Sequence, residues 1–321
     1  MFDIAKIFSR DFLVGFFLPS VLFITVATFI LFVFSPVPPE VLRDISGQIQ
    51  GGWAVSSAII AGWFLGILLL AINRTLFRFL EGYIGLDRTL FVNLQLRRFD
   101  MLEERISRIE QSYREEAKCG GAKPQTRQKY MQLLLHRRTY YPLKREHVLP
   151  TVFGNVLRAF ETYSGAMYGM DSIPLWSRLI AVIPKDFRET INGARSQVDF
   201  AVNMIYLSLV AVLGYCILFL LTSTAPMFWI VILLLLVAWL AYQMAISAAI
   251  QWGNLFKASF DLFRGDLFSR MGIEQPGSWE KERQYWNNIS QSFLYWDPIE
   301  LPRTRVKKAS GMQNSNDNEN Q

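Results

Sequence analysis

A polar segment in the middle of the chain carries the side chains best suited to chemistry. Its first three polar members stand at i, i+3 and i+6 of a helix predicted from residues 152–163, so they can share one helix face. Amide, guanidinium, carboxyl and phenol groups together can bind a polar ligand or a partner protein. The alternative is that the four charged residues form structural ion pairs, while Tyr163 and Trp176 pack the core. The candidate contact residues are Asn155, Arg158, Glu161, Tyr168, Asp171 and Arg178.

The same segment offers little for catalysis. It contains no recognisable nucleophile–base pair, and neither His136 nor His147 lies inside it. Cys119 lies in a polar turn and Cys216 in a predicted membrane helix, so we expect no disulfide. With so few Cys and His residues, a Cys/His zinc site is disfavoured. No nucleotide-binding, kinase or HExxH motif is present. We therefore expect a non-enzymatic protein without a cofactor or a Cys/His metal site, and the sequence leaves a carboxylate-rich site as the alternative.

The residues around this segment form a pattern with characteristic spacing. It begins with Leu149-Pro150-Thr151, Gly154-Asn155, Leu157-Arg158-Ala159, Glu161 and Tyr163, and it continues with Tyr168-Gly169, Asp171, Trp176, Arg178 and Leu179. Over about 45 residues the pattern is similar to that of a loose group of uncharacterised bacterial four-helix membrane proteins. It departs from that group at Ser177, where the group has Pro. The resemblance implies a shared fold and bacterial origin, and it implies no activity.

The apolar runs of the sequence predict the membrane helices on either side of this segment. Residues 200–256 hold no charged side chain, and such a run is long enough for two membrane crossings, because one crossing needs about 20 apolar residues. A second pair lies near the N-terminus, where the first apolar run has no signal-peptide cleavage pattern. We predict crossings at residues 12–34, 53–72, 200–221 and 226–250. The predicted fold class is an all-α polytopic membrane protein with a helical cytoplasmic domain.

The distribution of basic residues predicts the orientation. Residues 74–198 contain 21 Lys and Arg against 13 acids, and residues from 251 onward contain nine Lys and Arg. The loop 35–52 contains only Arg43, and the loop 222–226 contains none. Since positive charge remains on the cytoplasmic side, both termini and the middle insert are predicted to be cytoplasmic. The predicted location is a bacterial inner membrane, with several passes.

Local signals divide the chain into five parts. They are an N-terminal membrane hairpin at 1–73, a cytoplasmic helical domain at 74–199, a second membrane hairpin at 200–250, cytoplasmic helices at 251–308 and a disordered Asn/Ser-rich tail at 309–321. Pro184 before Lys185 and Asp186 favours a helix that runs into the third crossing. Gly272 is expected to end a helix that continues from the fourth. Ser278 is expected to cap the next helix.

Two further patterns concern the crossings themselves. Pro19 is expected to kink the first crossing and to release a backbone carbonyl that must find a partner in the bundle. Small residues at intervals of four let helix backbones approach closely, either within one bundle or between protomers. These candidate helix-packing residues are Ala58, Gly62, Gly66, Ala241, Ala245 and Ala249. In an oligomer, neutral polar side chains in the crossings, such as Ser208 and Gln243, could instead line a pore.

The expected partners follow from the charge pattern. Five arginines after the second crossing alternate with aromatic residues, which predicts contact with the bilayer and its anionic headgroups rather than with nucleic acid. These residues are Arg74, Arg78, Arg88, Arg97 and Arg98, with Phe77, Phe79, Tyr83 and Phe91. A cytoplasmic protein partner and a homo-oligomer are also expected. The preferred function is a scaffold, sensor or effector subunit that binds a partner or ligand. The alternative is an oligomeric channel gated by the cytoplasmic domain.

Overall fold

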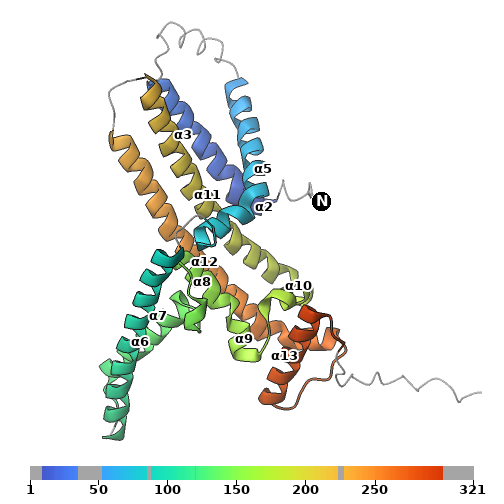
Figure 1. Ribbon diagram of the computed structural model, residues 1–321. Helices are drawn as coiled ribbons and strands as arrows, with labels where there is room; N and C mark the ends of the chain where they lie inside the picture. The colour runs from blue at the N-terminus through green and yellow to red at the C-terminus, as the bar shows by residue number, and fades with distance from the viewer. Residues whose placement is uncertain (1–8, 35–52, 85–87, 120, 223–227, 299–321) are drawn as a thin grey trace, which may run out of the picture. The chain divides into compact units, whose positions relative to one another are not determined.

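The computed structural model describes residues 9–34, 53–84, 88–119, 121–222 and 228–298. These residues are helical and contain no β-strand (Figure 1). The predicted loops at 35–52 and 222–226 and the predicted tail at 309–321 fall wholly or almost wholly outside the described residues. The helices are α2 (Arg10–Phe12), the π-helix η1 (Leu13–Phe17), α3 (Leu18–Phe34), α5 (Trp53–Glu81), α6 (Arg88–Lys118), α7 (Pro124–Tyr140), the 3-10 helix η2 (Arg145–His147), α8 (Val152–Glu161), α9 (Tyr163–Tyr168), α10 (Ser172–Val182), α11 (Lys185–Thr222), α12 (Phe228–Arg270) and α13 (Trp279–Tyr295).

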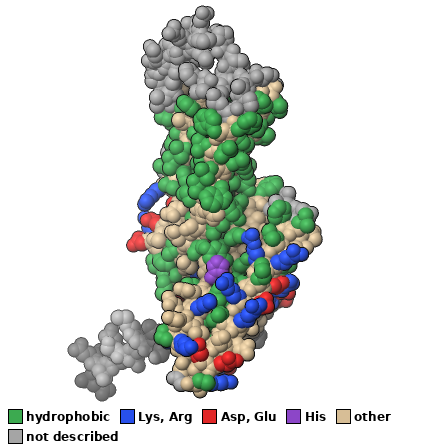
Figure 2. Space-filling view, turned by 90° about the vertical axis from the view of Figure 1, so that its left-hand side faces the viewer, with side chains coloured by type: hydrophobic (Ala, Val, Ile, Leu, Met, Phe, Trp, Pro, Cys, Tyr) green, Lys and Arg blue, Asp and Glu red, His purple; other side chains and the backbone are tan. Residues whose placement is uncertain are grey.

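Four of these helical segments are long and apolar enough to cross a membrane, as predicted. Helix α5 continues nine residues beyond the predicted end at Ile72, and α11 begins at Lys185, directly after Pro184. Large apolar side chains such as Phe64 and Leu220 are exposed on these helices, as lipid contact requires. On the face shown in Figure 2, hydrophobic side chains cover the apolar helices, and charged side chains gather outside that region.

The chain divides into two compact units. The first contains residues 1–163 and 184–258, and the second contains residues 164–183 and 259–321. In the first unit α3, α5 and α11 lie side by side (Figure 1). One core cluster consists of Phe12, Phe16, Leu69 and Leu207, and another consists of Ile30, Tyr215, Ile230 and Leu234.

Glycines on α5 allow the close approach of the first crossing. A Cβ atom at Gly62 would lie 2.8 Å from Cγ2 of Val21, and one at Gly66 would lie 3.4 Å from backbone atoms of Phe16 and Phe17. Ala58, one turn before Gly62, is half-buried. The second small-residue set is buried on α12, where Ala241, Ala245 and Ala249 are at most 4% exposed. Both sets therefore include positions buried inside a single protomer.

Pro19 releases a backbone carbonyl in the first crossing, as predicted. Proline lacks an N–H group, so the carbonyl of Gly15, four residues earlier, loses its helical donor. The chain widens into the π-helix η1 at this point, and the amide Nδ2 of Asn203 donates to the Gly15 carbonyl at 2.8 Å. The freed carbonyl thus has a partner on α11, and Gly15 itself packs against Ser196 and Asp199. This confirms that a bundle neighbour satisfies the released group.

Helices α6, α7 and α8 extend the first unit outside the apolar region. The rings of Tyr113 and Tyr130 stack with centroids 5.4 Å apart, which joins α6 to α7. Phe160 of α8 packs edge-on against Trp252, and a Cβ at Gly253 would lie 2.4 Å from that phenylalanine ring. Helix α8 therefore rests against the extension of the fourth crossing at a position that only glycine permits.

The second unit consists of α9, α10, α13 and the final turns of α12. Trp286 is fully buried, and its ring centroid lies 3.9 Å from that of Phe268. The expected helix boundaries are confirmed. Gly272 has a φ of +67° after the end of α12, and the Ser278 hydroxyl accepts a hydrogen bond from the Lys281 N–H at the start of α13.

Candidate functional site

The structure gives Asn155 a structural role. Its side chain is completely buried in α8, and both ends of the amide are used by one residue. Oδ1 accepts from the Leu149 N–H at 2.7 Å, and Nδ2 donates to the Leu149 carbonyl at 3.0 Å. This amide closes the turn that leads into α8, because a buried backbone segment needs partners for its polar groups.

The neighbouring motif residues join α8 to the end of α5. The Thr151 hydroxyl caps α8 by accepting from the Gly154 N–H, and it donates to the Leu80 carbonyl at 2.8 Å. A Cβ at Gly154 would lie 2.6 Å from the Glu81 carbonyl oxygen, so only glycine allows this contact. We call residues 149–155 the α5–α8 joint. The spacing of this part of the motif is explained by packing and capping.

Arg158 and Glu161 form the ion pair that the alternative interpretation predicts. Nη1 of Arg158 lies 3.6 Å from Oε2 of Glu161, and the two side chains are 29% and 42% exposed. Burial raises the pKa of the Glu161 carboxyl above its usual 4.5, although the Arg158 charge opposes the increase. The net environment therefore disfavours the ionised carboxylate.

This leads to a prediction about pH. A carboxyl whose pKa is raised by folding lowers stability as the pH rises from about 4.5 through the folded-state pKa. We expect Glu161→Gln to be stabilised relative to wild type by an amount that grows between pH 4 and neutral pH. The gain should remain under about 1 kcal/mol, because the side chain is partly exposed. Thermal unfolding of both proteins across that pH range measures it, and a difference independent of pH would contradict it.

The other three candidate residues belong to the second unit. The Tyr168 hydroxyl donates to Oδ1 of Asp261 at 2.6 Å, and Asp171 caps α10 by accepting from the Ile173 N–H at 3.0 Å. The Arg178 guanidinium lies 3.7 Å above the ring of Phe293 and donates to the Pro174 carbonyl. Each side chain thus has a local structural partner. The six predicted residues are divided three and three between the two units.

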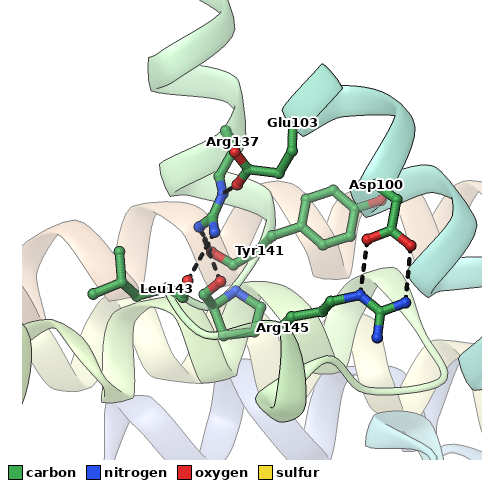
Figure 3. Close-up of polar contacts among 7 residues, drawn as sticks. Asp100, Glu103, Arg137, Tyr141, Leu143 and Arg145 are labelled. Carbon is green, nitrogen blue, oxygen red and sulfur yellow. Dashed lines mark hydrogen bonds and ion pairs between the residues drawn. The ribbon is translucent and has the colours of Figure 1, made fainter. Parts of the chain in front are cut away.

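A buried arginine clamps the base of the α6–α7 hairpin (Figure 3). Nε of Arg137 lies 2.5 Å from Oε1 of Glu103 on α6. Its two terminal nitrogens donate to the carbonyls of Tyr141, Pro142 and Leu143, where α7 has ended. The guanidinium also lies 4.6 Å from the ring centre of Phe99. One side chain therefore joins α6, α7 and the following turn.

A second arginine fixes the same turn from outside. Nε and Nη2 of Arg145 donate to the two carboxylate oxygens of Asp100 at 2.8 and 2.9 Å (Figure 3). Such a two-point contact restrains orientation as well as distance. The ring of Tyr141 packs edge-on against Phe99, with centroids 5.6 Å apart. The turn after α7 is consequently held on α6 by two ion pairs and an aromatic contact.

This clamp supports an open groove of about 720 Å³. Its walls come from α6, from the end of α7 and from the first residue of α8. The lining residues are Arg98, Met101, Leu102, Arg105, His136, Tyr140, Tyr141 and Val152. The volume lies within the usual range for sites that bind small molecules. The lining combines cationic heads with apolar and aromatic surface, and it contains no carboxylate.

The groove carries uncompensated positive charge. Arg98 and Arg105 are two helical turns apart on α6, so they project from the same face. The nearby acids on α6 are engaged elsewhere, since Asp100, Glu103 and Glu104 pair with Arg145, Arg137 and Arg108. Among the described residues, neither groove arginine has an ion-pair partner. The groove can therefore receive a negatively charged group.

Histidine and tyrosine complete the polar lining. The His136 ring lies 4.5 Å from the ring of Tyr140, one turn further along α7. Burial raises the pKa of the Tyr141 phenol, so that group remains neutral and adds no negative charge. The sequence pattern predicts headgroup contact for Arg98, and it assigns His136 neither a catalytic nor a metal-binding role. No sequence signal joins positions 98 and 105 to positions 136 and 140, because they are paired only by the folding of the hairpin.

Comparison of the chain with protein-family models, with curated proteins and with solved structures returns no match. The molecule is an all-α polytopic membrane protein with four membrane-spanning helices, and a clamped helical hairpin outside them carries a basic groove.

Proposed function

We propose that this protein is a non-enzymatic sensor or effector subunit of a bacterial inner membrane, whose cytoplasmic helices bind a phosphate-bearing ligand. The observation that carries the proposal is the pair Arg98 and Arg105, which line the groove and have no ion-pair partner in the described part of the chain. Two guanidinium groups with a nearby imidazole provide several N–H donors for phosphate oxygens. Tyr140 and Met101 provide ring and thioether surface for an organic part of the ligand.

The location of the groove supports a role in signalling to the membrane helices. Val152 lines the groove, and the preceding residue Thr151 bonds to the Leu80 carbonyl at the end of α5. A ligand that orders Val152 therefore acts next to Thr151, which contacts the second membrane-spanning helix directly. The excess of Lys and Arg in residues 74–198 favours a cytoplasmic location for the groove.

The proposal predicts that Arg98→Gln and Arg105→Gln each weaken binding of inorganic pyrophosphate about tenfold or more. Hydrogen bonds to charged groups contribute about 1.5–3 kcal/mol, and 1.4 kcal/mol corresponds to a factor of ten. Calorimetry on the full chain in nanodiscs of neutral lipid measures the affinity. A second series uses nanodiscs that contain phosphatidylglycerol, and it distinguishes a free phosphate ligand from a lipid headgroup. A headgroup that occupies the groove will compete with pyrophosphate.

The matched control is Arg108→Gln. It removes the same charge from the same helix, but Arg108 is paired with Glu104 and does not line the groove. Its affinity for pyrophosphate should remain close to that of wild type. Equal losses in all three variants would show that only the net charge of the helix matters, and the groove would then not be the binding site.

A further inference from the structure

A second cluster of polar groups lies inside the apolar bundle of the first unit. Asp199 of α11 is only 6% exposed, and Oδ1 of its carboxyl accepts from Nδ2 of Asn73 on α5 at 3.0 Å. Asn203 lies one turn further along α11, is completely buried and donates to the Gly15 carbonyl. Gly15 packs against the Cβ of Asp199, so the first three crossings meet at this cluster.

The cluster has more acceptors than donors. Oδ1 of Asn73 and Oδ1 of Asn203 are both buried and have no hydrogen-bond partner. Rotating either amide by 180° does not help, because it would turn an oxygen toward the Asp199 carboxylate or toward the Gly15 carbonyl. The orientations of both amides are therefore set by their partners. A buried polar atom without a partner is costly, so these two oxygens require an explanation.

The charge of the cluster is also incompletely balanced. Among the described residues, Asp199 receives one hydrogen bond and takes part in no ion pair. Arg195, one turn earlier on α11, and Asp11, in the first crossing, act on it electrostatically with opposite signs. A carboxylate taken out of water is costly unless it is paired. Carboxylate and amide oxygens can both coordinate a cation, which would give these groups a partner.

We propose that Asp199, Asn73 and Asn203 bind a monovalent cation of the sodium class. Carboxylate and amide oxygens are ligands for hard cations. Asp199 and Asp11 carry two negative charges against the one positive charge of Arg195, so one monovalent ion balances these groups, whereas a divalent ion would leave excess positive charge. The bound ion ties α5 and α11 together at their contact with η1. This inference is independent of the groove and its ligand.

Thermal unfolding of the full chain in nanodiscs tests the site. The protein is compared in NaCl, KCl and N-methylglucamine chloride at constant ionic strength. We expect a saturable rise in Tm with one of the alkali cations, roughly 5 °C at a hundred times its Kd. Asp199→Asn keeps the shape and an acceptor for Asn73 but removes the charge, so it should abolish the shift. An equal Tm in all three salts, or an equal shift in Asp199→Asn, would overturn the proposal.

The matched control is Thr25→Val. Its hydroxyl bonds only to the Val21 carbonyl of its own helix and is exposed at the surface of the bundle, so the salt-dependent shift should persist. If Asp199→Asn does not fold, radioactive sodium decides the matter on the wild-type protein. Saturable binding of about one ion per chain supports the site, and binding that does not saturate, or none at all, rejects it.

Discussion

Replacing Arg137 with Met is expected to destabilise the first unit by about 2–4 kcal/mol. The substitution keeps an unbranched stem of similar length but removes every N–H donor of the guanidinium. The buried carbonyls of Tyr141 and Pro142 lose their partner, and leaving such acceptors unsatisfied costs about 1–3 kcal/mol each. The carbonyl of Leu143 loses a partner too, but this residue is exposed, so water can replace the guanidinium there. Glu103 is 44% exposed, so water can solvate its carboxylate once the ion pair is gone. The broken ion pair therefore accounts for only a small part of the lost folding stability. Denaturant or thermal unfolding in mild detergent measures the change.

The loss should also be local to the base of the hairpin. Hydrogen exchange is expected to accelerate at residues 137–148, because the clamp holds the turn after α7 onto α6. Arg137→Lys should recover only part of the stability, since one ammonium cannot reach a carboxylate and three carbonyls in the geometry of a planar guanidinium. Arg138→Met is the control, because the adjacent arginine is exposed. If both methionine variants unfold alike, the clamp contributes nothing.

Replacing Asn155 with Ala is expected to cost about 3 kcal/mol or more. Both the N–H and the carbonyl of Leu149 would lose the hydrogen bond that Asn155 supplies, and a cavity would remain in a fully buried position. Asn155→Asp should be worse, because the new oxygen would face the Leu149 carbonyl and place a charge in the core. Unfolding midpoints of the two variants provide the comparison.

An asparagine on an exposed surface serves as the control. Asn192 lies on α11 and is exposed, so Asn192→Ala should change stability by at most about 0.5 kcal/mol. The α5–α8 joint predicts a further effect for Asn155→Ala, namely faster hydrogen exchange at residues 148–155 and at the end of α5. Unchanged exchange at the end of α5 would indicate that the turn folds independently of that helix.

The clamp and the joint bear on the proposed function because they surround the groove. Tyr141 belongs to both the clamp and the groove lining, and Val152 belongs to both the joint and the groove lining. A ligand bound between Arg98, Arg105 and His136 would therefore contact two structural connections. This arrangement is what a sensor or effector subunit requires, since binding energy must reach an element whose position can change.

Several features of the protein followed from the sequence alone because their causes are local. The length of an apolar run determines the number of crossings, and a cap or a proline determines where a helix begins or ends. These signals correctly located the start of α11 after Pro184, the end of α12 at Gly272 and the cap of α13 at Ser278. The effect of Pro19 was predictable for the same reason, because a missing N–H group always releases the carbonyl four residues earlier.

Other features were decided only by the tertiary structure. Whether Asn155 binds a ligand or closes a turn depends on burial, which periodicity does not report. The basic groove requires α6 and α7 to fold against each other, and the Asp199 cluster requires contact with Asn73, 126 residues away. The sequence placed Asp199 just outside the third crossing, where a charge is ordinary. Packing against Gly15 and Asn73 buries it, because only the folded bundle brings these three helices to one point.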